Sequence, residues 1–292
     1  MIRFGMHSSL WTASWTREAA EALIPEAARY GLEVIEIALL APETVDVEHS
    51  RALFKEHGVA PTASLCLPME DNAALYPDRA ERFLMPALEV AHALGSNILC
   101  GVTYSTLGWR SGRPPEEQEL ANIAKALKPV ARRAAEFGML IGIEPCNRYE
   151  THLLNTAEQA LAMLDRIGED NITIHLDTYH MNIEEKGIGR GIATAGAKSR
   201  YIHLSESDRG VPGTGTIDWD ETFRALAASG FDGDLVMESF VTLPPEIASA
   251  LSVWRSVARD RYEVLDHGVP YLKSLAALHG LSGPGNRVVP AA

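Results

Sequence analysis

The sequence predicts an α/β protein folded as one (β/α)8 TIM barrel, a closed ring of parallel strands inside a ring of helices. Three observations predict this fold. Short apolar β-type runs alternate with longer helical patterns eight times, no linker or composition shift divides the chain, and 292 residues suit a single barrel of this kind. We expect the barrel to cover residues 1–281 and residues 282–292, which contain glycine and proline, to form a flexible C-terminal tail.

The expected strands are short runs of apolar residues, rich in β-branched side chains. They lie at residues 3–7, 34–38, 59–65, 97–102, 139–144, 172–177, 200–204 and 235–238. The expected helices lie near residues 17–30, 46–57, 78–94, 116–137, 156–167, 188–198, 218–229 and 246–278. Strict alternation of the two kinds of segment is typical of a parallel sheet covered by helices.

Helix boundaries carry recognisable signals. Glycines stand where several helices should stop before the next strand, among them Gly58, Gly95 and Gly138. Thr156, followed three positions later by Gln159, has the pattern of a capping box that opens a helix. The repetition of these boundary signals supports the alternation of strands and helices better than any single signal does.

An open, doubly wound sheet is the alternative arrangement of eight parallel strands. A dinucleotide-binding sheet of that type carries a glycine-rich phosphate loop after its first strand. Here the first strand leads into Met6-His7-Ser8-Ser9-Leu10, which lacks that loop. The closed barrel is therefore favoured.

Composition excludes several classes of partner. Lys and Arg total 26 against 39 Asp and Glu, and the net charge of −13 argues against nucleic acid and against an anionic membrane surface. No apolar stretch approaches the roughly 20 residues that cross a bilayer. Three cysteines without paired spacing, and no long apolar segment near the first residues, favour a reducing compartment, and the expected location is the cytoplasm.

Four side chains that can bind a metal stand at the ends of successive predicted strands. They are Glu144, Asp177, His203 and Glu238. The carboxyl ends of barrel strands meet at the catalytic face, so these four should face one point. Oxygen and imidazole ligands suit Mn²⁺, Mg²⁺ or Co²⁺, and the absence of a thiolate argues against structural zinc.

Each of these residues taken alone has an ordinary structural interpretation, such as a helix cap or a buried imidazole. Buried carboxylates without partners are costly, however, so three carboxylates and one imidazole at successive strand ends favour a shared cation. His175 shares the parity of Asp177 but should lie one layer deeper, as part of the core. Glu36 and Cys66 also fall near strand ends, and we expect them to line the pocket at most.

Four segments that contain these residues resemble those of a known family. They lie at 143–156, at 176–185 with the run Asp-Thr-Tyr-His-Met-Asn-Ile-Glu-Glu, at 203–215 and at 237–240. They are similar, in this order, to the metal-binding segments of ketose 3-epimerases. That family includes D-tagatose, D-allulose (psicose) and L-ribulose 3-epimerases and belongs to the xylose-isomerase-like barrel superfamily.

The resemblance implies roles for individual residues. Glu144, Asp177, His203 and Glu238 would bind the metal, and Glu144 and Glu238 would also act as the acid/base pair. Glu150, His180 and Arg209 match positions that hydrogen-bond the sugar near its carbonyl end. The Met6-His7 pair stands where many relatives carry aromatic residues, which leaves the preferred ketose open.

The implied activity is that of an isomerase: metal-dependent epimerisation at C3 of free ketoses, by proton exchange between two glutamates through a cis-enediolate. The expected ion is Mn²⁺, with Mg²⁺ or Co²⁺ as alternatives, and the expected assembly is a homodimer or homotetramer. Two-faced proton exchange fits the strand order, because Glu144 and Glu238 end strands three steps apart in a ring of eight.

Three other functions remain to be compared with this one. An aldose–ketose or hydroxypyruvate-type isomerase would use a similar metal barrel but yield an aldose from a ketose. A metal-dependent endonuclease of the same superfamily is disfavoured by the charge of −13. A sugar-binding module without catalysis would not need both Glu144 and Glu238.

Overall fold

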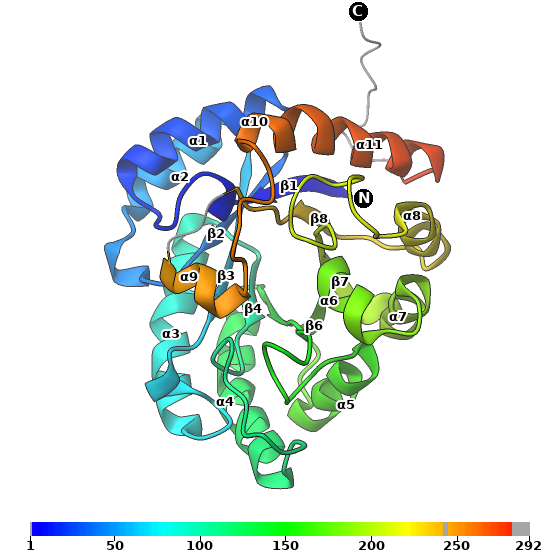
Figure 1. Cartoon of the computed structure of the whole chain (residues 1–292). Helices are drawn as coiled ribbons and strands as arrows, with labels where there is room; N and C mark the ends of the chain where they lie inside the picture. The colour runs from blue at the N-terminus through cyan, green and yellow to red at the C-terminus, as the bar shows by residue number, and fades with distance from the viewer. Residues whose placement is uncertain (1, 242–244, 282–292) are drawn as a thin grey trace, which may run out of the picture.

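The computed structural model describes residues 2–241 and 245–281. Its strands pair in parallel in sequence order, and β8 pairs with β1, which closes the barrel (Figure 1). The strands are β1 Arg3–His7, β2 Val34–Ala38, β3 Ala60–Cys66, β4 Ile98–Val102, β5 Leu140–Ile143, β6 Ile172–Asp177, β7 Ser199–Leu204 and β8 Asp234–Met237. The predicted barrel is confirmed, with every strand boundary within one residue of its expected place. The predicted tail lies outside the described residues.

Helices surround the strands as an outer ring (Figure 1). The main ones are α1 Arg17–Arg29, α2 Val47–His57, α3 Pro77–Leu94, α4 Glu117–Glu136, α5 Ala157–Ile167, α7 Ile188–Ala195, α8 Trp219–Ala228 and α11 Val269–Leu278. Short 3-10 turns occupy Ser8–Leu10, Pro42–Thr44, Met69–Asp71 and Gly196–Lys198. Thr156 and Gln159 form the predicted capping box, and Gly58 and Gly95 end their helices in the left-handed conformation.

Two helical segments differ from the prediction. The sequence did not indicate α6 (Thr178–Glu184), which begins directly after β6 because the carboxylate of Asp177 caps it by accepting the N–H of Tyr179. The single helix expected at 246–278 is also wrong. α9 ends at Leu251, before Ser252 with its positive φ of 55°, and helical structure resumes at α10 (Arg261–Glu263), where Asp260 provides a new cap. A π-helical turn, Val264–Gly268, then leads into α11.

The strands place an apolar layer beneath a polar one inside the barrel. Side chains two apart on a strand share a face, so Tyr201 and His203 both point inward from β7. On the adjacent strand, Val236 points inward and Glu238 follows it at the mouth. The lower layer is a separate buried cluster of Val34, Ile98, Cys100, Tyr201 and Val236. The polar residues of the site therefore rest on a packed floor.

The larger apolar core lies between the strands and the helices. On α4, for example, Ile123, Leu127 and Val130 are fully buried at helical spacing. Gly142 on β5 lets neighbouring strands approach closely, since a Cβ there would lie 2.5 Å from the Cβ of Cys100. Within residues 2–241 and 245–281, no helix combines the length and the apolar composition needed to span a bilayer.

Candidate active site

The four predicted metal ligands converge at the carboxyl end of the barrel. Nδ1 of His203 lies 3.8 Å from a carboxylate oxygen of Glu144, 3.7 Å from one of Asp177 and 3.5 Å from one of Glu238. All four residues are buried or nearly so, with Asp177 and His203 only 1% and 2% exposed. The structure thus brings together side chains at the carboxyl ends of β5, β6, β7 and β8 around one imidazole nitrogen.

The other ring nitrogen of His203 is held by Glu36. Nε2 donates to the Glu36 carboxylate at 2.6 Å, and the same oxygen accepts the hydroxyl of Tyr201 at 2.7 Å. Thr62 is hydrogen-bonded to that hydroxyl at 2.7 Å. Because Nε2 is committed to Glu36, Nδ1 is the ring nitrogen that faces the group of carboxylates, which is the orientation that a carboxylate gives to a metal-binding histidine. Burial acts to lower the pKa of His203, but Glu36, Glu238 and Asp177 outweigh it and raise that pKa well above its usual value, so a cation bound at Nδ1 would replace a proton there.

The residues present fit a divalent cation. Nδ1 of His203 is buried and has no hydrogen-bond partner, an arrangement that costs free energy when nothing is bound to it. Three carboxylates and one neutral imidazole form a donor set typical of Mn²⁺ or Mg²⁺. A dication would also balance negative charge on the three carboxylates.

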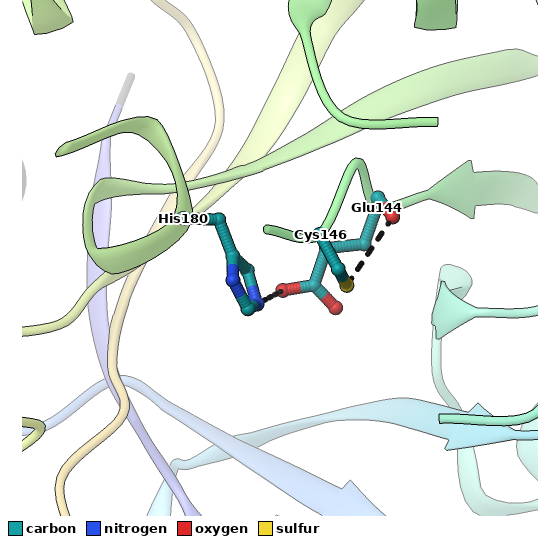
Figure 2. Close-up of side chains that lie close together, drawn as sticks. All are labelled: Glu144, Cys146 and His180. Atoms are coloured by element: carbon teal, nitrogen blue, oxygen red, sulfur yellow. Dashed lines mark hydrogen bonds and ion pairs between the residues drawn. The ribbon is translucent and has the colours of Figure 1, made fainter. Parts of the chain in front are cut away.

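A second group of metal-capable side chains adjoins this site but does not suit a cation. The ring of His180 points at the carboxylate of Glu144, with Nε2 at 3.7 Å, and Cys146 lies beside them (Figure 2). However, Nδ1 of His180 accepts the backbone N–H of Asn147 at 3.1 Å. Nε2 in turn faces the guanidinium of Arg209 at 3.2 Å, which can only donate, so both ring nitrogens are engaged and His180 has no free lone pair for a metal. Burial also raises the pKa of the Cys146 thiol well above its usual range, so it stays protonated.

The three predicted substrate-binding residues line one side of the cavity. His180 faces the cavity with Nε2, which lies 3.2 Å from the guanidinium of Arg209. Glu150 holds Asn147 through one oxygen at 2.8 Å, while its second oxygen is buried without a hydrogen-bond partner. The guanidinium of Arg209 donates to Asp177 at 3.1 Å and to Glu238, and it stacks 4.2 Å from the ring centre of Tyr179.

A tightly bonded loop after β7 positions Arg209. The residue has a positive φ of 61°, a conformation that needs support from its surroundings. Glu206 provides it by accepting the backbone N–H of Gly213 at 2.8 Å, that of Ile217 at 3.2 Å and the indole N–H of Trp219 at 2.9 Å. The backbone oxygen of Arg209 also accepts the N–H of Phe240 at 2.8 Å.

A cavity of about 460 Å³ opens from these residues toward the first half of the barrel. Glu144, Glu150, His180, Arg209 and Glu238 form its polar end. The opposite end is largely apolar and includes side chains that follow β2, β3 and β4, together with two from α9 (Pro245–Leu251). In the view of Figure 1, α9 falls within the ring of outer helices. The volume suits a small polar molecule such as a monosaccharide.

Comparison with known proteins identifies the family. A family model described as the xylose isomerase-like TIM barrel matches residues 24–257. An L-ribulose 3-epimerase of Methylomonas sp. (strain DH-1) is 36% identical over 278 residues, which cover 93% of this chain and 97% of the relative. A ketose 3-epimerase of Arthrobacter globiformis is 36% identical over 280 residues, covering 93% and 96%. This chain belongs to the ketose 3-epimerase family.

Solved structures agree with that assignment. The crystal structure of a D-allulose 3-epimerase from Methylomonas sp. in complex with D-allulose matches this structure with a TM-score of 0.89 and 35% identity. The match covers 94% of this chain and 96% of that one. The family, the fold and the isomerase class expected from the sequence are confirmed. The individual roles of the site residues stay predictions.

Glu144 and Glu238, the two glutamates of this epimerase site, have opposite electrostatic environments. Burial raises the pKa of Glu144 well above its usual value, and Asp177 and Glu238 add to the effect. Burial also acts to raise the pKa of Glu238, but Arg209 and His203 outweigh it and hold that pKa well below the usual value. A pair of carboxyls with pKa values moved apart is typical of acid/base partners. A dication among these oxygens would favour the ionised form of each.

Glu36 is the functional residue that sequence reasoning undervalued. We expected it to line the pocket at most, but it is fully buried beneath His203 and lies outside the cavity wall. Burial acts to raise its pKa, yet the imidazoles of His203 and His7 hold that pKa below the ordinary value. A charged residue inside the apolar run of β2 was the available signal, because such a residue needs a buried partner. Cys66 does line the cavity as expected, and His175 is fully buried in the core.

Proposed function

We propose that this protein epimerises C3 of free ketoses of the D-tagatose, D-fructose/D-allulose and L-ribulose type. The names of its relatives support this class of substrate, as does the D-allulose complex of a structural relative. We further propose that Glu144, Asp177, His203 and Glu238 hold the divalent cation. The observation that carries this second part is the unpartnered Nδ1 of His203, which faces three carboxylate oxygens at 3.5–3.8 Å.

Epimerisation needs one group on each face of the reacting carbon. The C3–H proton of a ketose is weakly acidic, and its removal leaves a planar enediolate. A bound dication would supply Lewis-acid stabilisation of the negative charge that develops on the substrate oxygens. One glutamate of the pair, in its ionised form, takes the C3 proton from one face. The other, as a carboxylic acid, returns a proton to the opposite face, and the reverse reaction uses the two in exchanged roles.

The positions of Glu144 and Glu238 in the barrel support the proposed roles. Glu144 directly follows β5 and Glu238 directly follows β8, three strands further round the ring. Asp177 and His203 come from the two strands between them. A sugar held at the centre would therefore have one glutamate on each side. His180 and Glu150 would position it, through the Nε2 edge of the imidazole and an unpartnered carboxylate oxygen.

The charges that line the cavity support an unphosphorylated substrate. Among the described residues that line it, Arg209 is the only arginine or lysine. Its guanidinium already contacts Asp177 and Glu238, so it is not free to neutralise a phosphate. Phosphate recognition normally relies on unpaired basic side chains or backbone N–H groups. A neutral sugar fits this balance better than a sugar phosphate.

Three finer features belong to the same proposal. Mn²⁺ is the proposed ion, with Mg²⁺ and Co²⁺ as alternatives, because the donor set contains only oxygen and imidazole. The proposed assembly is a homodimer or homotetramer, by analogy with the family. The proposed location is the cytoplasm, which suits three free cysteines.

Product analysis in D₂O tests the proposed activity. The chelated and then Mn²⁺-loaded protein is given D-fructose, D-tagatose and L-ribulose in turn, and the products are identified by chromatography and NMR. We expect a second ketose with deuterium at C3, and no turnover before metal is added. An aldose product would instead support the isomerase alternative, and a ketose product that kept its original C3 proton would contradict exchange through two carboxylates.

A further inference from the structure

His7 stands at the carboxyl end of β1 and forms part of the cavity wall. It is 8% exposed, and the edge of its ring packs against His203 with 5.8 Å between the ring centres. It is neither a metal ligand nor a member of the substrate-binding group proposed above. A polar side chain in this position can meet any molecule that fills the cavity.

The tautomer of His7 is set by Ser9. Nδ1 accepts the backbone N–H of Ser9 at 3.2 Å and lies 2.5 Å from the Ser9 hydroxyl. Nε2 therefore carries the ring proton. Its nearest acceptors are the Ser64 hydroxyl at 3.5 Å and a Glu36 oxygen at 3.7 Å, both longer than a good N–H···O hydrogen bond. His7 thus has a donor in the cavity that the protein itself satisfies poorly.

His7 and Ser64 lie opposite the proposed substrate-binding group. They come from β1 and β3, whereas Glu150, His180 and Arg209 follow β5, β6 and β7 in the closed ring. If the reacting carbons lie beside the second group, the remainder of the sugar chain extends toward the first. The wall around it is apolar, with Leu65, Phe83 and Val102 among its members, so polar groups there are few.

Other hydroxyls in this half of the cavity are already engaged. The Thr12 hydroxyl donates to the Ser14 carbonyl at 2.7 Å, and the Thr106 hydroxyl accepts from the side-chain amide of Asn72 at 3.2 Å. Ser9 is held by His7. Nε2–H of His7, with the Ser64 hydroxyl beside it, is therefore the polar pair best placed to recognise a substrate hydroxyl.

We infer that His7 is a specificity-determining residue that hydrogen-bonds, together with Ser64, a hydroxyl of the ketose beyond C3, on C4 or C5. This inference rests on the proposed function and adds to it the feature by which ketoses are distinguished. A site that is built to hydrogen-bond a hydroxyl discriminates against a substrate that lacks it or presents it in the wrong configuration. Because the contact is to a non-reacting part of the sugar, it should affect KM more than kcat.

The test is a double-perturbation cycle on the Mn²⁺-loaded, full-length protein. The variants are His7→Leu, which removes the donor, and His7→Gln, whose amide N–H can reach the place of Nε2–H. The probes are D-fructose, 4-deoxy-D-fructose and 5-deoxy-D-fructose. For the wild type we expect one deoxy sugar to lose about tenfold in kcat/KM. We expect His7→Leu to lower kcat/KM on D-fructose by a similar factor, mainly through KM. On that deoxy sugar, His7→Leu should cause no further loss in kcat/KM. We expect His7→Gln to recover most of the loss on D-fructose.

The inference would be overturned if the loss in kcat/KM caused by His7→Leu multiplied with the loss caused by each deoxy sugar, because the two changes would then act independently. Full activity of His7→Leu on D-fructose would also overturn it. Ser64→Ala provides a second variant, expected to lose a smaller factor on the same hydroxyl, in case His7→Leu does not fold. Mn²⁺ stoichiometry and the unfolding midpoint of each variant show whether the metal site and the fold are intact. Failure of the wild type to epimerise any free ketose would contradict the proposed function instead, so the two failures are distinguishable.

Discussion

Glu36 on β2 and His203 on β7 form a buried hydrogen-bonded pair, with 2.6 Å between a carboxylate oxygen and Nε2. The pair fixes which imidazole nitrogen is free. Nε2 is committed to Glu36, and Nδ1 is left facing Glu144, Asp177 and Glu238. The orientation of the proposed metal site therefore depends on a residue that does not itself reach the cavity.

Replacement of that carboxylate should weaken metal binding. In Glu36→Gln, the side-chain amide can present an N–H to Nε2, which would favour the tautomer with the proton on Nδ1. We expect the affinity for Mn²⁺ to fall by about 10–100-fold, the usual effect of removing a residue that orients a metal ligand. Isothermal titration of the chelated protein with Mn²⁺ measures it. Glu56→Gln, on the exposed face of α2, is the matched control, and equal affinities in the two variants would show that Glu36 has no such role.

Removing either proposed acid/base group should stop the reaction without unfolding the protein. Glu144→Gln and Glu238→Gln keep the size of each side chain and one potential metal-binding oxygen, but remove the basic carboxylate. We expect kcat to fall by about 10³-fold or more in each, since positioned acid/base groups contribute about 10²–10⁴-fold. Steady-state kinetics with saturating Mn²⁺ and circular dichroism provide the measurements. A variant that kept kcat within a few-fold of the wild type would remove that glutamate from the mechanism.

His175 should make the metal-free protein less stable at acid pH. Burial, helped by His203, lowers the pKa of His175 to about 3 in the folded state, against 6.5 for an unperturbed histidine. Between these two values the unfolded chain binds a proton at this position and the folded protein does not. Its contribution to stability is therefore complete above about pH 6.5 and is lost as the pH falls, at about 1 kcal/mol per pH unit.

The measurement is the free energy of unfolding in urea at several pH values between 6.5 and 4.5, in the presence of a chelator. His175→Asn removes the titrating group, so its stability should decline less steeply with falling pH than that of the wild type. Parallel profiles for the two proteins would mean that His175 does not titrate differently in the folded and unfolded states.

Much of the fold could be predicted because its signals are local. Strand and helix periodicity, the capping box at Thr156 and the glycines that end helices such as α2 and α3 specify their own segments without distant partners. α6 was missed because it has only seven residues and starts from the same Asp177 that ends β6. The break after α9 was missed because it depends on the backbone conformation of Ser252 and a new cap at Asp260.

The part of the site that strand ends alone bring together was predictable. The hydrogen bonds between side chains from distant segments were not. Parallel strands in a closed ring must bring Glu144, Asp177, His203 and Glu238 to one face. The partner of Glu36, by contrast, lies 167 positions further along the chain, and no local pattern connects the two. The tautomer of His7 is set by a backbone N–H group, and the ring of His180 lies between donors of Asn147 and Arg209, which only the three-dimensional structure reveals.

The central claim is that four side chains from successive strands hold one divalent cation. Crystals of the Mn²⁺-loaded protein, measured for anomalous scattering from manganese, test it directly. We predict one strong peak at about 2.0–2.3 Å from Nδ1 of His203 and from an oxygen of each of Glu144, Asp177 and Glu238. Manganese bound elsewhere, or a fully loaded crystal in which these four residues coordinate no manganese, would contradict the proposed metal site.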